Sequence, residues 1–589
     1  MPHKALRTRG SQARNFAAMS RTLSLAMLAC SAAGAFGQIP FVGNTTPTHG
    51  AVIGRYTELA ADHAAAQLFV VGKDDGGQPL HLFVIHDGGP ADPEAIRRSG
   101  KNILFILNGI HPGEPDGIDA SMMLAQQLLE SDQLGGLLVH TAVCIVPIYN
   151  VSGAQMRNSF SRANQNGPES YGFRANAIGL DLNRDMMKMD SRNAQTLVPL
   201  LRRWDPDVFL DTHVSNGADH RYVMELLTTR KEKLAPAMGE FMARTLVPGL
   251  YDWMEGKDIP MCPYFETRKE VPDSGLMGFH DGPRYTTGYT ALFQTIGIMA
   301  ESHMLKPYAQ RVNATHQLML GILAVMDREH TALADARREA RRQALSTTTV
   351  PLRWTLDTTV VEELPFKGYR AEHVPSAVSG LPRLRYDTTA PVDLVVPWMD
   401  HYRPERSTNK PKAYLVPQQW RDVIQRLVLN QVRLDPILRD TVLTGAYYRI
   451  EDYRTVATPH EGRYLHHEVK CSAEMAAVRA RAGDMLVHMG TEMDAYVTAA
   501  LEPEAEDSFF AWGFFDAVLQ QKEWFSPYVF EDIAAELLAT DAAMRKQFDA
   551  RRAGNPGFAE DAMAQLLFIY RHSKYMEPGY MRYPIARIF

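Results

Sequence analysis

Short apolar runs alternate with amphipathic segments along the first half of the chain. Buried-strand patterns occupy residues 80–85, 103–107, 141–148, 208–212 and 297–302. Segments with helical spacing of apolar residues occupy 116–129, 193–204, 233–246 and a long stretch from 307 to about 344. Strands that alternate with helices of this length predict an α/β fold with a mostly parallel, mixed sheet flanked by helices.

The pattern changes near residue 346. Residues 348–415 are rich in Thr, Val and Pro and show little helical periodicity, which favours strands and turns. A helix is predicted at 418–432, and alternating patterns at 447–453 and 464–469 predict further strands. We therefore divide the chain into an α/β domain at 45–345 and a β-rich accessory region at 346–589.

The first 37 residues have the pattern of a signal peptide. Basic residues precede an apolar stretch at 23–35, which ends in Ala35-Phe36-Gly37, a small-x-small cleavage pattern. A mitochondrial-type transit peptide is one alternative, because this segment is rich in Arg, and lipoprotein anchoring at Cys30 is another. No later apolar run reaches the length of a membrane span. The sequence thus predicts an exported protein, periplasmic or secreted.

Length, net charge and cysteine spacing argue against several classes of protein. The 589 residues exceed one ordinary domain, and the net charge of −6 argues against nucleic-acid binding. Three cysteines would remain after cleavage: Cys144, Cys262 and Cys471. The absence of a Cys-x-x-Cys pair argues against thiolate zinc sites and dithiol redox chemistry. Cys144 is predicted to be a buried thiol, whereas the sequence alone does not decide whether Cys262 and Cys471 form a disulfide.

A His and a Glu follow the strand pattern at 103–107 after a glycine turn, as His111-Pro112-Gly113-Glu114. This short motif also arises by chance, so its context must decide. His213 and Glu301 also lie at the ends of predicted strands, where sheets of this class bind their ligands. Imidazole nitrogen and carboxylate oxygen suit zinc. His111, Glu114 and His213 are therefore a candidate zinc-binding set.

Two aspartates could orient these ligands. A metal-bound imidazole usually donates its other N–H to a carboxylate or a carbonyl. Asp181 and Asp211 are candidate acceptors, and Asp211 lies two residues before His213, on the same face of a strand. Either residue has a simpler alternative role as the cap of a turn.

Four motifs follow one another along the chain: His111-x-x-Glu114, Asp181-x-Asn183-Arg184, His213 and Glu301. In this order they resemble the motifs of the carboxypeptidase A-like family of zinc metallocarboxypeptidases, in particular its longer bacterial, exported members with a C-terminal extension. The resemblance covers roughly residues 50–335. It implies one zinc ion per chain on His111, Glu114 and His213, and a peptide substrate whose free terminal carboxylate is bound by Asn183 and Arg184.

The resemblance implies three further roles. Glu301 would be the general base. An arginine upstream of the Asn-Arg pair would stabilise the oxyanion, and Arg174 fits best, with Arg162 as the rival. A tyrosine before the catalytic glutamate would close over the substrate, and we place this role on Tyr289, with Tyr285 as the alternative.

Elementary chemistry agrees with these roles. The planar fork of Arg184 matches a carboxylate, which would select chain ends and make the enzyme an exopeptidase. A glutamate beside the metal can accept a proton from water and pass it to the leaving amine. The interval from Glu114 to His213 is short and Asp185 follows Arg184, so the pocket walls are not predicted. We expect no site in residues 346–589.

Two other functions are compatible with these motifs. The first is a zinc amidohydrolase that deacylates N-acyl amino acids or trims cell-wall peptides. The second is a non-catalytic peptide-binding protein, which would have lost a ligand or the general base, and neither loss is seen. Outside the site, His466-His467 is predicted to be structural and His303 to pack near Glu301, while a basic residue near 284–286 would favour acidic chain ends.

Overall fold

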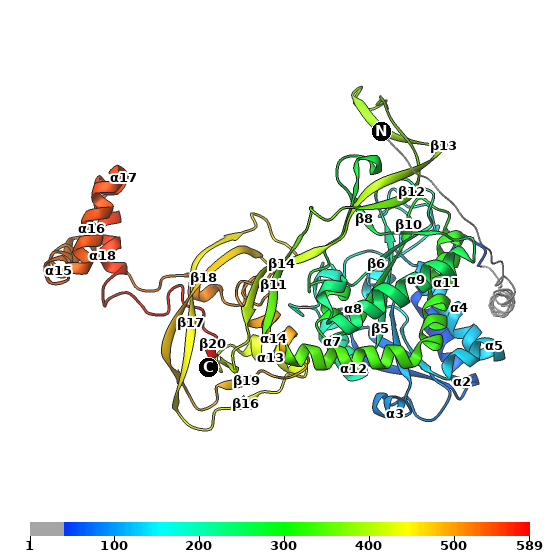
Figure 1. Cartoon of the computed structure of the whole chain (residues 1–589), viewed down its shortest axis with the longest axis horizontal. Helices are drawn as coiled ribbons and strands as arrows, with labels where there is room; N and C mark the ends of the chain where they lie inside the picture. The colour runs from blue at the N-terminus through cyan, green and yellow to red at the C-terminus, as the bar shows by residue number, and fades with distance from the viewer. Residues whose placement is uncertain (1–40) are drawn as a thin grey trace, which may run out of the picture. The chain divides into compact units, whose positions relative to one another are not determined.

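The computed structural model describes residues 41–589, so the predicted signal peptide at 1–37 and Cys30 lie outside the described residues. An eight-stranded mixed sheet forms the centre of the first half (Figure 1). Its strands, in spatial order, are β1 (Ala66–Lys73), β2 (Pro79–Ile85), β4 (Thr141–Val146), β3 (Asn102–Leu107), β5 (Val208–Ser215), β10 (Ile296–His303), β6 (Met224–Thr228) and β7 (Met261–Pro263).

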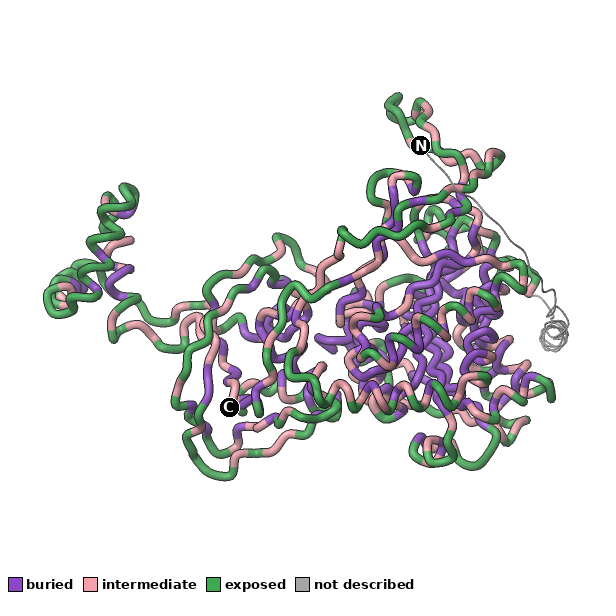
Figure 2. Tube along the Cα trace, in the orientation of Figure 1, coloured by how far each residue is buried: buried purple, intermediate pink, exposed green. Residues whose placement is uncertain are grey.

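The four central strands, β4, β3, β5 and β10, run parallel to one another. Every residue in them is buried, and Figure 2 shows this part of the chain as the densest group of buried residues. Continuous burial is what strands need when helices cover both faces of a parallel sheet. The predicted α/β fold and all five predicted strands of this half are confirmed.

Helices pack on both faces of the sheet. On one face, Tyr56 of α2 packs against Phe83, and on the other, Leu197 of α7 joins a cluster with Val84. Phe83 and Val84 point to opposite faces because side chains alternate along a strand. The helices of this half are α2 (His49–Asp62), α3 (Pro93–Arg98), α4 (Asp116–Glu130), α5 (Asp132–Gly135), α6 (Val151–Gln155), α7 (Arg192–Trp204), α8 (Pro236–Phe241), α9 (Val247–Glu255), α10 (Thr286–Ala291), α11 (Tyr308–Arg328) and α12 (His330–Ser346).

The long helix predicted from 307 to about 344 is two helices, because α11 ends at Arg328 and α12 begins at His330. The segment predicted at 233–246 begins its regular helix at Pro236, and helical structure continues to Glu255 through α8 and α9. Within the described part of the chain, no helix is both long and apolar enough to cross a membrane.

The accessory region is β-rich, as predicted. Its strands are β11 (Thr349–Leu356), β12 (Glu362–Pro375), β13 (Pro382–Met399), β14 (Tyr402–Asn409), β15 (Ala413–Val416), β16 (Asp435–Pro436), β17 (Thr441–Thr455), β18 (His466–Ala480), β19 (Met485–His488) and β20 (Ala586–Ile588). The predicted helix at 418–432 is the shorter α13 (Arg421–Leu429), and α14 (Asp494–Leu501) follows β19. Strands β15 to β20 form one six-stranded sheet.

A helical cluster near the C-terminus was not predicted. It consists of α15 (Pro527–Thr540), α16 (Ala542–Gly554), α17 (Pro556–Ala559) and α18 (Ala562–Arg571). These helices share a small apolar core of their own that includes Phe530, Phe548 and Phe568. The three described cysteines, Cys144, Cys262 and Cys471, are free thiols, and Cys144 is fully buried.

The accessory region and the α/β domain share both a sheet and a core. Strand β13 pairs in parallel with β9 (Leu276–Gly278), which in turn pairs with β8 (Phe265–Thr267). One apolar cluster extends from Phe105 in the central sheet through Leu197 of α7 to Tyr414 and Phe509 of the accessory region. Residues 43–589 thus form one compact unit. The boundary at 345 marks a change in sequence pattern within this unit.

Candidate active site

The three candidate zinc ligands lie at the carboxyl ends of adjacent parallel strands. Strand β3 ends at Leu107, and Gly109, at φ +65°, turns the chain toward His111 and Glu114, which precede α4. His213 lies near the end of β5. Because β3 and β5 are neighbours, the turn and the strand end meet at one edge of the sheet.

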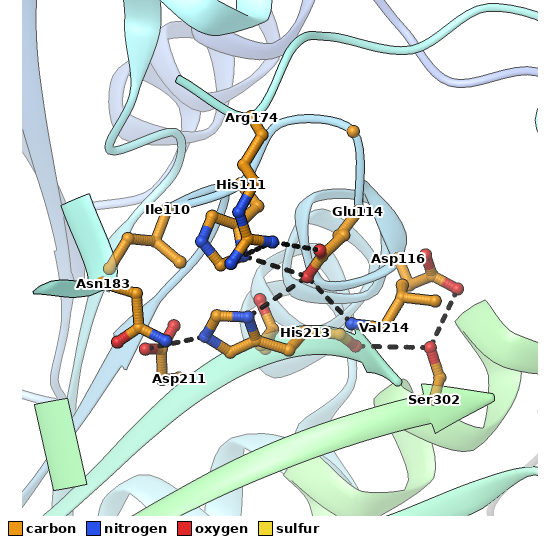
Figure 3. Close-up of polar contacts among 12 residues, drawn as sticks. Ile110, His111, Glu114, Asp116, Arg174, Asn183, Asp211, His213, Val214 and Ser302 are labelled. Carbon is orange, nitrogen blue, oxygen red and sulfur yellow. Dashed lines mark hydrogen bonds and ion pairs between the residues drawn. The ribbon is translucent and has the colours of Figure 1, made fainter. Parts of the chain in front are cut away.

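The ligand atoms of this set converge. One atom each of His111, Glu114 and His213 lies within 4.8 Å of the others, and all three residues are buried. The Glu114 Oε2 atom lies 3.3 Å from His111 Nδ1 and 3.1 Å from His213 Nδ1, as Figure 3 shows. The backbone N–H of Val214 donates to the same oxygen at 3.0 Å. Two nitrogens and a carboxylate therefore face one small space.

Both imidazoles turn their other nitrogen to an aspartate, as the sequence suggested. His111 Nε2 lies 2.9 Å from Asp181 Oδ1, and His213 Nε2 lies 3.0 Å from Asp211 Oδ2. A proton on each Nε2 would leave Nδ1, which faces Glu114, as the nitrogen that can bind a metal. Arg174 Nη1 also lies 3.3 Å from Nδ1 of His111. Burial lowers the pKa of His213, but the carboxylates of Asp211 and Glu114 together raise it well above its usual value, so the space between these groups favours a cation. The donor set therefore fits a zinc ion.

A second buried cluster has the same composition but different hydrogen bonds. His220, Glu225 and His303 also bring their polar atoms within 4.8 Å. His220 Nδ1 accepts from the backbone of Tyr222, and its Nε2 faces Glu225 at 3.1 Å. His303 Nδ1 accepts from Leu305 N, and its Nε2 donates to the carbonyl of Ala218.

Each imidazole of this second cluster already uses both nitrogens. Metal binding through His220 Nε2 would require the loss of its proton while Nδ1 still accepts a hydrogen bond, which leaves an imidazolate. We interpret the cluster as a satisfied hydrogen-bond network, which agrees with the packing role expected for His303.

Glu301 lies in the same pocket as the ligands. It is buried in β10 and is paired in register with His213 of β5 on one side and with Glu225 of β6 on the other. Burial raises the pKa of Glu301 to about 8; the charge on His213 opposes this shift, and the carboxylates of Glu114 and Glu225 add to it. A dication bound beside Glu301 would lower this pKa. A carboxyl group of this kind can exchange protons near neutral pH.

Asn183 and Arg184 line the pocket from a short turn. The Asp181 side chain caps this turn, η3 (Leu182–Arg184), by accepting from Asn183 N at 2.9 Å. The guanidinium of Arg184 lies 4.4 Å from the ring centre of Tyr285 and is partly exposed, so its donors can reach a ligand. The cavity has a volume of about 390 Å³ and is open to solvent.

Two arginines approach the ligands. Arg162 Nη1 lies 2.7 Å from Glu114 Oε1, and Arg174 Nη1 lies 3.4 Å from the same oxygen. Arg174 also holds Asp181 through two nitrogens, at 2.8 and 3.1 Å. Both arginines line the pocket, so the choice between Arg174 and Arg162 stays open.

The two candidate tyrosines, Tyr289 and Tyr285, lie in different surroundings. Tyr289 is buried in α10 at 1% exposure, and its hydroxyl donates to Asn430 Oδ1 at 2.6 Å. It does not reach the pocket, because it points into the core shared with the accessory region. Tyr285, the alternative, precedes α10 and lines the pocket.

We expect Tyr285→Phe to lower kcat/KM about 10-fold, the scale of one hydrogen bond to substrate, without changing the melting temperature. Tyr289→Phe should show the opposite pattern. It leaves Asn430 short of one donor in the core, which costs about 1–3 kcal/mol of stability. Peptide hydrolysis and thermal unfolding of both variants test this prediction, and a loss of activity confined to Tyr289→Phe would restore the original choice.

Sequence patterns missed the apolar wall of the pocket. The wall is formed by side chains from β6, β10 and the loops after β7 and β9: Leu227, Met299, Tyr264 and Phe279. Leu227 and Met299 are partners across β6 and β10, a register that hydrophobic pattern alone does not give. Arg284 does not line the cavity; its Nε atom pairs with Asp507 at 2.8 Å. The expectation of a basic pocket floor near 284–286 is therefore wrong.

The fold and the ligand set define a metal-dependent hydrolase of the α/β class. Residues 56–315 match the family described as zinc carboxypeptidase. Over these residues the chain is similar to that family, and the match supports a zinc metallocarboxypeptidase in this part of the chain. The match lies inside the α/β domain that the sequence predicted.

The chain is also similar to relatives and solved structures of known name. Carboxypeptidase 2 of Trichophyton equinum is 23% identical over 441 residues, which covers 70% of this chain and 74% of the relative. Among solved structures, a metallo-carboxypeptidase from Burkholderia cenocepacia is 16% identical, with a TM-score of 0.36 over 48% of this chain and 69% of that one. A metallo-carboxypeptidase from Pseudomonas aeruginosa is 17% identical, with a TM-score of 0.35 over 48% and 68%.

Proposed function

We propose that this chain is an exported zinc carboxypeptidase that removes the last residue of peptides with a free C-terminal carboxylate. One observation carries the proposal. A zinc-type ligand set, a buried glutamate and an arginine fork line the same cavity of about 390 Å³. The ligand set is His111, Glu114 and His213, the glutamate is Glu301, and the fork is Arg184.

Each of these pocket residues has its own role in the proposed reaction. Arg184 and Asn183 bind the terminal carboxylate and so place the last peptide bond near Glu301. A zinc ion on the ligand set would supply an electrophile for the carbonyl oxygen and lower the pKa of water. Glu301 takes a proton from the attacking water and delivers it to the departing amine. Arg174, or Arg162 in its place, donates to the oxygen on which negative charge develops.

The pocket wall sets the preferred side chain. Leu227, Met299, Tyr264 and Phe279 offer apolar surface, and the aromatic pair Tyr264–Phe279 meets edge to face with centroids 5.8 Å apart. Burial of a Leu or Phe side chain is worth about 1.5–3 kcal/mol relative to leaving it exposed. We therefore expect apolar and aromatic C-terminal residues to be preferred over charged ones.

A panel of N-acylated dipeptides tests the proposal. Peptides that end in Phe or Leu should have kcat/KM at least ~10-fold above those that end in Lys or Glu, as the burial energy requires. Amidation of the C-terminus should lower kcat/KM about 100-fold, because Arg184 loses a charged partner. Both values come from initial rates measured with zinc-loaded protein.

Each failure of this panel has a distinct meaning. Equal cleavage of amidated and free peptides would reject the exopeptidase assignment. Turnover of N-acyl amino acids without turnover of dipeptides would establish the deacylase alternative. Absence of both activities in protein that binds zinc would leave the non-catalytic peptide-binding protein as the better description.

A further inference from the structure

The turn of residues 460–463 in the accessory region lies against the active site. His460 and Arg463 exchange two backbone hydrogen bonds, of 2.7 and 3.1 Å, which close a two-residue hairpin turn. Both central residues have positive φ, +49° at Glu461 and +79° at Gly462. Gly is well suited to such a position, whereas Glu is not, because its Cβ disfavours left-handed backbone. The chain therefore keeps a glutamate where Asn, Asp or Gly would form the turn more easily.

The 460–463 turn contacts the loop that carries Asn183 and Arg184. A side chain on Gly462 would approach Leu180, which precedes that loop. Arg463 binds Asp190, at the other end of the loop, through two nitrogens at 2.7 Å. The turn is thus fixed to the loop at both ends, by packing at Leu180 and by a bidentate ion pair at Asp190.

Glu461 makes the contact closest to the site. Its carboxylate oxygen Oε2 accepts from the backbone N–H of Asp181 at 2.6 Å. A charged acceptor makes this hydrogen bond stronger than one between neutral groups. The contact joins residues 280 positions apart in sequence, so the accessory region fixes the backbone at Asp181.

Asp181 connects this hydrogen bond to both halves of the site. Its Oδ1 atom lies 2.9 Å from His111 Nε2 and accepts from Asn183 N at 2.9 Å, while its Oδ2 atom binds Arg174 at 2.8 Å. A displacement of the Asp181 backbone would move a zinc ligand and the carboxylate-binding turn together. Outer-shell groups of this kind typically change metal affinity or activity by 10–100-fold.

We propose that Glu461 is a positioning residue for the active site, and that the accessory region thereby completes the catalytic unit. The inference rests on the proposed function, because it takes His111 as a zinc ligand and Asn183–Arg184 as the substrate clamp. It also explains the unfavourable backbone at Glu461. A side chain long enough to reach Asp181 is retained at a position where a shorter one would stabilise the turn.

Glu461→Asn separates the two effects. Asn tolerates left-handed backbone and should preserve or raise the melting temperature, but it is one carbon too short to reach Asp181. We expect kcat/KM and zinc affinity, measured by chelator competition, to fall about 10-fold. Amide exchange over residues 181–184 should become faster. Glu461→Gln keeps the reach and an acceptor oxygen, so it should retain most of the wild-type activity.

Glu468 offers a matched control. It also has a positive φ, of +52°, and lies in the same region of the chain, but its side chain is exposed and pairs with Arg454. Glu468→Asn should therefore relieve the same backbone cost and leave zinc affinity, kcat/KM and exchange at 181–184 unchanged. A Glu461→Asn protein that behaves like Glu468→Asn overturns the proposal, as does faster exchange without loss of activity. Wild-type protein that neither binds zinc nor cleaves peptides would instead reject the proposed function. The amide-exchange data would then still test the hydrogen bond between Glu461 and Asp181.

Discussion

Replacing Glu301 by Gln is expected to lower kcat about 10³-fold and to leave the bound zinc in place, because general base catalysis contributes 10²–10⁴-fold. Gln has nearly the same shape but cannot accept a proton. Glu301 is not part of the ligand set and lies one strand away from His213, so zinc retention should not depend on its charge. Steady-state kinetics on the best peptide, together with zinc analysis of the same sample, measure both quantities.

Glu225→Gln is the matched control for this variant. Glu225 is also a buried carboxylate, next to Glu301 across β10 and β6, but it accepts from Ser215 and His220 and does not line the pocket. Its substitution should lower the melting temperature much more than it lowers kcat. Near wild-type turnover in Glu301→Gln would contradict the assignment of the general base, and so would equal losses of kcat in the two variants.

The candidate ligands could be recognised from sequence because each depends on local pattern. His111 and Glu114 follow a buried strand directly, and His213 and Glu301 lie near the ends of two others. Parallel neighbouring strands bring their carboxyl ends together, so three separate segments predict one site without any knowledge of long-range contacts. Asp211 could be predicted in the same way, since it shares a strand face with His213.

Residues whose surroundings come from the accessory region could not be predicted. Tyr285 and Tyr289 are equally suitable by position, and the choice between them depends on Asn430, which binds the Tyr289 hydroxyl from 141 positions away. Glu461 carries no motif, and its partner is the backbone of Asp181. A backbone N–H is present at nearly every residue, so no pattern of side chains reveals such a contact.

The boundary at 345 separates two parts of the chain by their predicted roles, but these two parts pack together. The apolar core continues from Phe105 to Phe509, and β9 of the α/β domain pairs with β13 of the accessory region. Removal of residues 346–589 would expose that core to water, which favours aggregation over a soluble catalytic fragment. The division is therefore useful for describing function, while folding involves both parts.

Substitution of His111 by Asn is expected to remove almost completely the one zinc ion that we expect each chain to hold. A ligand is lost in this variant, so the effect should exceed the ~10–100-fold loss of affinity typical for an outer-shell partner. Asp181→Asn should fall in that intermediate range, because Asp181 contacts His111 Nε2 at 2.9 Å. Zinc content after dialysis against a chelator ranks the variants.

His303→Asn is the control that separates the two buried clusters. Both nitrogens of His303 are engaged by backbone groups, so its substitution should lower stability and leave one zinc ion bound. Two zinc ions in the wild type, with one lost in His303→Asn, would show that the second cluster also binds metal. The hydrogen-bond argument predicts otherwise, because backbone groups already bond one nitrogen of His220 and both nitrogens of His303.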